Sequence, residues 1–127
     1  MKLRTKGNSL RLRVTPSEVK HLLRCGEIRE HVQLTANPEG RLTYALVSCL
    51  SGLRTTVAYQ SGNITVNVPE AQLEKWASSE DVGVYADIAL DNNQALSVAI
   101  EKDFACLDRS DADNEDTFQN PDLAAAC

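Results

Sequence analysis

One pattern of residues occurs twice along the chain, and its second occurrence lies 54 residues after the first. The clearest part is an apolar stripe with the helical spacing i, i+3 and i+4, formed first by Val19, Leu22 and Leu23. The stripe returns as Leu73, Trp76 and Ala77. Repetition at a fixed distance is typical of a duplicated structural unit, so both halves of the chain are expected to fold in the same way.

The segments around each predicted helix also match. Before each helix, apolar side chains alternate along a predicted strand that runs into Pro16 or Pro69, and proline is favoured at the first helical position. A second pair of alternating segments, joined by a polar turn, follows each helix. We predict a hairpin–helix–hairpin unit that occurs in residues 1–50 and again in residues 51–104. The prediction amounts to eight strands and two helices.

One short helix cannot cover the apolar face of a whole sheet, so the two units are expected to share one core. The predicted fold class is α+β, mostly β: an antiparallel sandwich or a curled barrel with two short helices. Residues 1–107 are predicted to form a single domain, and residues 108–127 an acidic C-terminal tail. At 127 residues and 43% hydrophobic composition, the chain has enough apolar material for a core without disulfide or metal staples.

The first residues include no apolar run that resembles a signal peptide or a membrane span, so we expect a cytoplasmic protein without a membrane association. The cysteines contain no C-x-x-C pair and are expected to be buried thiols rather than metal ligands. They are Cys25, Cys49, Cys106 and Cys127.

The first predicted hairpin is basic on one face. A two-residue loop at Gly7 and Asn8 would place Arg4 opposite Arg11, and Lys2 opposite Arg13. Like charges opposite each other destabilise a strand pair by up to about 1 kcal/mol, so this face is a candidate anion-binding site. The candidate anion-binding residues are Lys2, Arg4, Lys6, Arg11 and Arg13.

The alternative interpretation of this face is structural. Long basic side chains extend into water and protect a sheet edge from aggregation. The corresponding hairpin of the second unit, aligned on Gly62 and Asn63, would pair Tyr59 with Val66 and Gln60 with Thr65. Its polar face carries no charge, so the two hairpins differ in charge where they agree in pattern.

The acidic tail could itself neutralise the basic hairpin, either within one chain or across a homodimer. The candidate counter-charges are Asp108, Asp111, Asp113, Glu115 and Asp116. Phe104, Leu107 and Phe118 are expected to anchor this segment. A calcium loop is a poor match, because Asp116 stands where the turn-forming glycine belongs.

Catalytic motifs are absent from the sequence. The two histidines, His21 and His31, are expected to face solvent, and no phosphate loop, dinucleotide fingerprint or zinc-protease motif is present, so no cofactor is predicted. The remaining enzymatic hypothesis is a small metal-dependent phosphohydrolase that acts on a phosphorylated metabolite. It would use Asp103 and Asp108 beside the basic hairpin.

Both ends of the chain carry extended motifs. M-K-L-R-T-K-G-N-S-L-R-L-R-V-T at residues 1–15 and E-K-D-F-A-C-L at residues 101–107, with the later N-E-D-T-F-Q-N-P, resemble a family of short bacterial proteins that is known only as a domain of unknown function. The resemblance implies membership and no activity.

These observations favour a non-enzymatic binding or scaffold module. The expected partner is an anionic ligand or an acidic protein segment. Nucleic acid is disfavoured because the chain has a net charge of -5 and is only 5% aromatic. Deleting residues 108–127 is expected to raise the affinity for phosphorylated ligands or heparin.

Overall fold

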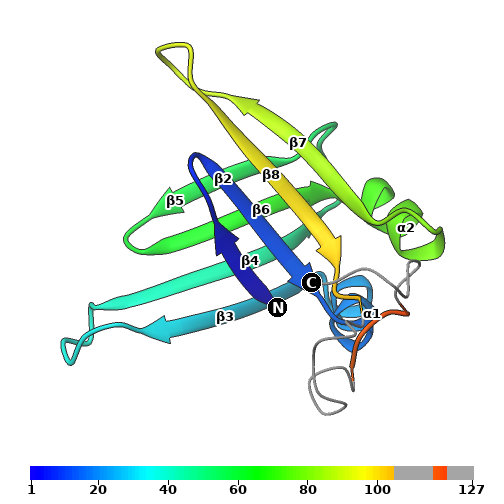
Figure 1. Cartoon of the computed structure of the whole chain (residues 1–127), viewed down its shortest axis with the longest axis horizontal. Helices are drawn as coiled ribbons and strands as arrows, with labels where there is room; N and C mark the ends of the chain where they lie inside the picture. Colours follow the sequence, from blue (N-terminus) through cyan, green and yellow to red (C-terminus); the bar gives the residue numbers. More distant parts are fainter. Residues whose placement is uncertain (105–115, 120–127) are drawn as a thin grey trace.

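The computed structural model describes residues 1–104 and 116–119. Within them the chain forms eight strands and two helices, as predicted, and the α+β, mostly β class is confirmed (Figure 1). In chain order the elements are β1 (Lys2–Thr5), β2 (Ser9–Val14), α1 (Pro16–Cys25), β3 (Glu27–Gln33), β4 (Arg41–Cys49), β5 (Thr56–Gln60), β6 (Asn63–Pro69), α2 (Glu70–Ser78), β7 (Gly83–Ala89) and β8 (Ala95–Lys102).

The two helices begin differently. In α1, the Thr15 side chain accepts a hydrogen bond from the Glu18 backbone N–H, and the Glu18 carboxylate accepts one from the Thr15 N–H, which is a complete capping box. The helix ends at Gly26, whose φ of 84° suits glycine. Helix α2 has no side-chain cap. Pro69 is the last residue of β6 rather than the first helical residue, because it still pairs with Cys49.

The strands form two four-stranded sheets, in the orders β1-β2-β8-β7 and β3-β4-β6-β5. Each sheet contains one hairpin from each half of the chain, and the hairpins meet through the parallel pairs β2–β8 and β4–β6. The expectation of a purely antiparallel arrangement was therefore wrong, and so was the curled barrel. Each helix carries the chain from one sheet to the other, so the two hairpins of one half cannot pair with each other.

The parallel pairs of the two sheets have equivalent registers. Leu12 of β2 lies opposite Ile100 of β8, and the residues related to them by a shift of 54, Val66 and Leu46, lie opposite each other in the second sheet. The same shift relates Leu22 of α1 to Trp76 of α2, both of which are buried. The two halves thus occupy equivalent places in the fold, while their origin by duplication stays a prediction.

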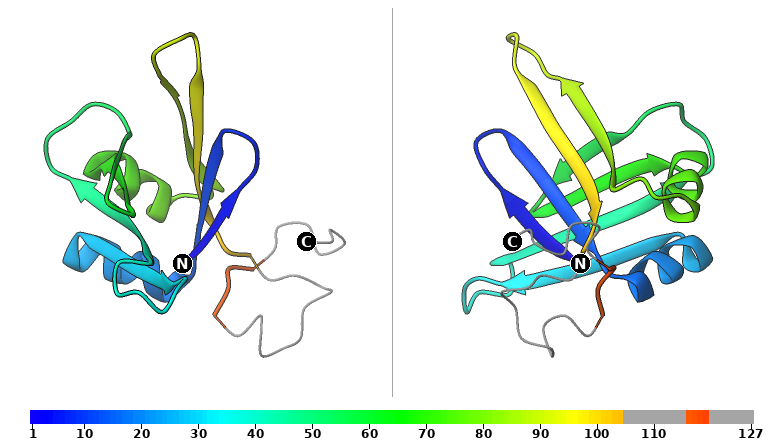
Figure 2. Two further views of the ribbon diagram at one scale, coloured as in Figure 1. Left: turned by 90° about the vertical axis from the view of Figure 1, so that its left-hand side faces the viewer. Right: turned by 45° about the vertical axis from the view of Figure 1, so that its right-hand side comes forward.

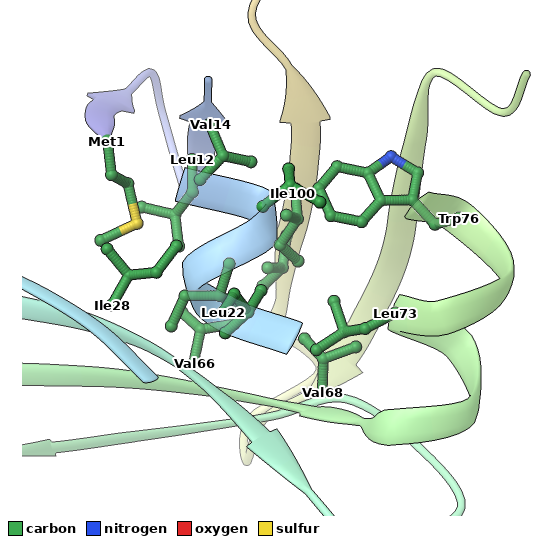
Figure 3. Packing of buried hydrophobic residues seen from close by; sticks show 13 residues of the cluster. Met1, Leu12, Val14, Leu22, Ile28, Val66, Val68, Leu73, Trp76 and Ile100 are labelled. Atoms are coloured by element: carbon green, nitrogen blue, oxygen red, sulfur yellow. The ribbon is translucent and has the colours of Figure 1, made fainter. Parts of the chain in front are cut away.

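One core lies between the sheets at the end where the helices pack (Figure 3). Both helices and both sheets contribute to it, and full burial of a large apolar side chain stabilises the fold by about 1.5–3 kcal/mol. The labelled members are Met1, Leu12, Val14, Leu22, Ile28, Val66, Val68, Leu73, Trp76 and Ile100.

The hairpins spread apart away from the helices (Figure 2). Val32 of β3 is 42% exposed although it lies on the same strand face as the buried Ile28. Tyr59 of β5 is 70% exposed although it lies on the same face as the half-buried Val57, and Leu34, which follows β3, is 65% exposed. Leu23 was expected in the helical core stripe and is 45% exposed. Apolar side chains are therefore buried only where the two sheets and the helices cover one another.

The hairpin β5–β6 has a different register from the predicted one. Its loop is Ser61-Gly62, with φ values of 51° and 78°, so Tyr59 pairs with Ile64, and Gln60 with Asn63. Positive φ at both loop positions is the geometry of a tight hairpin turn that follows the twist of the strands. The error is two residues, and a shift of two keeps every side chain on its predicted face.

The match between Leu3–Thr5 and Leu53–Thr55 is also wrong as a structural equivalence. Leu53 is 95% exposed in the connection between β4 and β5, and the register places Val57 at the position that corresponds to Leu3.

The cysteines were expected to be buried, but Cys25 is exposed and Cys49 is half-buried. Cys106 and Cys127 lie outside the described residues. No helix in the described part of the chain is long and apolar enough to cross a membrane.

Candidate functional site

The outer face of the first sheet is the side that points away from the core. Strand alternation places Leu3, Leu12 and Ile100 on the core side and the basic residues of β1 and β2 on the outer side. The predicted register is confirmed, with Arg4 opposite Arg11 and Lys2 opposite Arg13. The hairpin therefore does place like charges opposite each other.

The parallel pairing of β2 with β8 extends these rows across the sheet. Arg11 lies beside Ala99 and Ala99 beside Tyr85, while Ser9 lies beside Ser97 and Ser97 beside Asp87. Small side chains in the middle and long ones at both sides leave a hollow of about 540 Å³, here called the outer groove. It is lined by Arg4, Lys6, Ser9, Leu10, Arg11, Tyr85, Ala86, Asp87, Ser97, Val98 and Ala99.

One wall of the outer groove is basic. It consists of Arg4 and Lys6 from β1 and its loop, and Arg11 from β2. The opposite wall comes from the β7–β8 hairpin and presents Tyr85, Asp87 and Ser97. A volume of this size lies within the range of about 300–1,000 Å³ that is typical of small-molecule sites.

The compensation for the opposed cations comes from the C-terminal end of β8. Arg11 Nε lies 3.0 Å from Glu101 Oε1, and Lys2 Nζ lies 3.1 Å from Asp103 Oδ2. Each opposed pair thus has one member with a carboxylate partner. Within residues 1–104 and 116–119, Arg4, Lys6 and Arg13 have no carboxylate at ion-pair distance.

Sequence reasoning missed Glu101 and placed Asp103 beside the basic hairpin only as a catalytic carboxylate, not as a counter-ion. Asp103 is 2% exposed and Glu101 is half-buried, and both belong to the E-K-D-F motif. Their spacing of two residues at the end of a predicted strand was the available signal, but the parallel pairing that brings Arg13 beside Glu101 could not be inferred from it.

Tyr85 connects the two walls. Its hydroxyl donates a hydrogen bond to Glu101 Oε2 at 2.8 Å, while the other oxygen of that carboxylate forms the ion pair with Arg11. Partial burial of the phenol raises the pKa of Tyr85 to about 12, and the bond to Glu101 adds to this rise. Tyr85 is therefore an uncharged donor at neutral pH.

Asp87 has a different environment. Its Oδ1 accepts a hydrogen bond from the Ser97 hydroxyl at 2.9 Å, and Asp87 is exposed at the groove wall. No cation lies at ion-pair distance from Asp87 within the described residues. A carboxylate with one hydrogen bond keeps acceptor capacity for a ligand.

The second sheet has a hollow at the equivalent place. It measures about 250 Å³ and is lined by Ala58, Gln60, Ser61, Asn63 and Thr65. By the shift of 54, Ala58, Gln60 and Thr65 correspond to Arg4, Lys6 and Arg11. The same backbone site is therefore basic in one sheet and uncharged in the other.

The structure places the one described counter-charge of the tail away from the groove. Asp116 accepts a hydrogen bond from the Ser17 hydroxyl at 2.5 Å, and this bond lowers the pKa of Asp116. It stands at the N-terminus of α1, where a negative charge is favourable. Asp108, Asp111, Asp113 and Glu115 lie outside the described residues.

Phe104 and Phe118 do anchor the C-terminal segment. Their rings lie 5.9 Å apart in an edge-on contact, the Phe118 N–H donates to the Asp103 carbonyl, and Phe118 packs against the core. Lys102 lies over the Phe118 ring and donates to the Ser79 carbonyl. Leu107 lies outside the described residues.

The residues proposed for hydrolysis are not gathered in the outer groove. Asp103 is buried against Lys2, and Asp108 lies outside the described residues. In residues 1–104 and 116–119, no three His, Cys, Asp or Glu side chains are placed to hold a metal ion. His21 and His31 are exposed, as expected.

Comparison with known proteins identifies a family and no activity. The model of a family described as a family of unknown function, DUF7009, matches residues 1–122. No curated protein and no solved structure matches the chain.

Proposed function

The chain belongs to this family of unknown function, which assigns it no activity, and we propose that it is a non-enzymatic binding protein that holds a phosphate-like anion in the outer groove. The observation that carries the proposal is the basic wall. Three cationic side chains converge on one hollow, and two of them, Arg4 and Lys6, have no carboxylate partner among the described residues.

The energetics favour an anion at this wall. Opposed cations across a strand pair cost up to about 1 kcal/mol, and an anion between them reverses the sign of that interaction. Arginine offers a planar set of donors that matches phosphate, and hydrogen bonds to charged groups contribute about 1.5–3 kcal/mol each. The second sheet folds with neutral residues at these positions, so the fold itself does not require the charges.

The test replaces the basic wall with the residues of the second sheet. In the variant Arg4→Ala/Lys6→Gln, each new side chain is the one found at the equivalent position, and no ion pair of the described residues is lost. Inorganic phosphate and pyrophosphate are titrated by calorimetry at fixed ionic strength. We expect at least a tenfold loss of affinity in the variant, and weaker binding by the unchanged protein as salt is raised.

The matched control is Arg54→Ala/Lys75→Gln. It makes the same two substitutions at exposed positions outside the groove, so the net charge changes equally. Its affinity should equal that of the unchanged protein. Equal losses in both variants would reduce the effect to net charge, and an absence of phosphate and pyrophosphate binding by the unchanged protein would refute the proposal.

A further inference from the structure

We infer that the ligand of the outer groove is a phosphomonoester that carries hydroxyl groups, of the sugar-phosphate class. This inference rests on the proposed anion site and concerns the wall opposite to it. That wall differs in chemistry from the basic one, because it presents an aromatic ring, a hydroxyl group and a carboxylate.

The outer groove is larger than a bare phosphate group. The basic residues stand on β1 and β2, whereas Tyr85 and Asp87 stand on β7, and β8 lies between them. Neighbouring strands are separated by about 4.8 Å, so β2 and β7 are about 10 Å apart. A phosphate held by Arg4 and Lys6 would leave the region over Ala99 and Ser97 to the rest of the ligand.

The negative charge of Asp87 disfavours a second anionic group at the wall opposite to the basic one. Glu101 is compensated by Arg11 and by the Tyr85 hydroxyl, whereas the Asp87 carboxylate is bound within the described residues by the Ser97 hydroxyl alone. Its negative charge repels a second phosphate and attracts hydrogen-bond donors. The groove therefore favours one phosphate at one end and hydroxyl groups at the other.

The aromatic side chain suits the same ligand. Tyr85 is 60% exposed, while its hydroxyl is held by Glu101, so an apolar ring face borders the groove. An aromatic ring of this kind offers apolar contact area at a low entropic cost. Sugars present C–H faces together with hydroxyl groups and can contact both Tyr85 and Asp87.

The experiment compares ligands that share one phosphate and differ in hydroxyl groups. Methyl phosphate is the reference, and glycerol 3-phosphate, ribose 5-phosphate and glucose 6-phosphate are the probes, each titrated by calorimetry at fixed ionic strength. We expect at least one probe to bind tenfold or more tightly than methyl phosphate. Fructose 1,6-bisphosphate should bind no more tightly than the best monophosphate, because its second phosphate meets Asp87.

The variant Asp87→Ala tests the assigned wall. It should reduce the preference for the hydroxylated probe to near one and leave methyl phosphate binding unchanged or stronger. Asp87→Asn should keep part of the preference and strengthen bisphosphate binding, because an amide still accepts a hydrogen bond without the charge. The control Asp91→Ala removes the same charge from the turn of the same hairpin and should change none of these ratios.

The outcomes separate the two proposals. If phosphate and methyl phosphate bind at the basic wall but none of the three probes binds more tightly, the sugar-phosphate inference is wrong and the anion site stands. The same conclusion follows if Asp87→Ala weakens every ligand equally. If no phosphate compound binds, both are wrong.

Discussion

The hairpins β1–β2 and β5–β6 have the same backbone arrangement, but their outer faces differ in charge. In the first sheet the hairpin β1–β2 presents Arg4, Lys6 and Arg11, and in the second the hairpin β5–β6 presents Ala58, Gln60 and Thr65 at the equivalent positions. The inner faces of the same hairpins are alike, since both bury leucine or valine. Packing fixes the inner residues, whereas the outer residues are free to serve a ligand.

The strands at the far edges of the two sheets also differ. Counting along the paired strands, Arg29 and His31 of β3 stand where Tyr85 and Asp87 stand in β7. Arg29 is bound to Glu27 by an ion pair of 2.8 Å, so its charge is already compensated. Only the first sheet therefore combines a basic wall with a hydrogen-bonding wall.

The largest expected effect concerns what the two halves share. Trp76→Ala should lower the free energy of unfolding by about 3–5 kcal/mol and the equivalent Leu22→Ala by about 2–5 kcal/mol, because both side chains are fully buried in one core. Urea denaturation followed by circular dichroism measures both. Each variant should unfold in one transition, while Leu53→Ala, at a 95% exposed position, should stay within about 0.5 kcal/mol of the unchanged protein. Two separate transitions would show that the halves do not share a core.

A transplant tests whether the difference between the outer faces is sufficient for binding. In the Arg4→Ala/Lys6→Gln background, Ala58→Arg/Gln60→Lys should restore phosphate affinity to within about tenfold of the original, a difference of about 1.4 kcal/mol. Calorimetry gives the affinity. The control Ala71→Arg/Gln72→Lys places the same side chains on exposed positions of α2 and should restore nothing. Recovery by both pairs would mean that net charge, not the groove, binds phosphate.

The smallest effect concerns the two helix starts. Thr15→Ala should cost about 1 kcal/mol because it removes the capping box that α2 lacks. Chemical denaturation measures the loss, with Ser51→Ala in the exposed connection as the control. If Thr15→Ala leaves the stability unchanged, α1 is held by packing alone, as α2 is.

Local structure was predictable because local residues decide it. The capping box at Thr15 and Glu18, the end of α1 at Gly26 and the Arg4–Arg11 register all follow from neighbouring residues and were confirmed. The predicted register of the hairpin β5–β6 was wrong by two residues, because Ser61 and Gly62 adopt the turn that Gly62 and Asn63 were expected to form. Sequence similarity located Gly62 in the turn, but the twist of the strands decided which two residues form the turn.

Only the basic wall of the candidate site was predictable from the sequence. The basic wall follows from a hairpin whose two strands are adjacent in sequence, so its residues could be named from the register alone. The opposite wall, with Tyr85, Asp87 and Ser97, is more than seventy residues away in sequence, and nothing local joins it to the first hairpin. Its position depends on the parallel contact between β2 and β8.

The sequence by itself determined the strands, the helices, the apolar faces and the charge of the first hairpin, because alternation, helical spacing and turn residues act over a few residues. Only the tertiary structure decided which hairpins share a sheet, and with that the outer groove and the pairing of Arg11 with Glu101. The physical reason is that each helix is too short to cover a sheet, so the two halves bury their apolar faces together by exchanging hairpins.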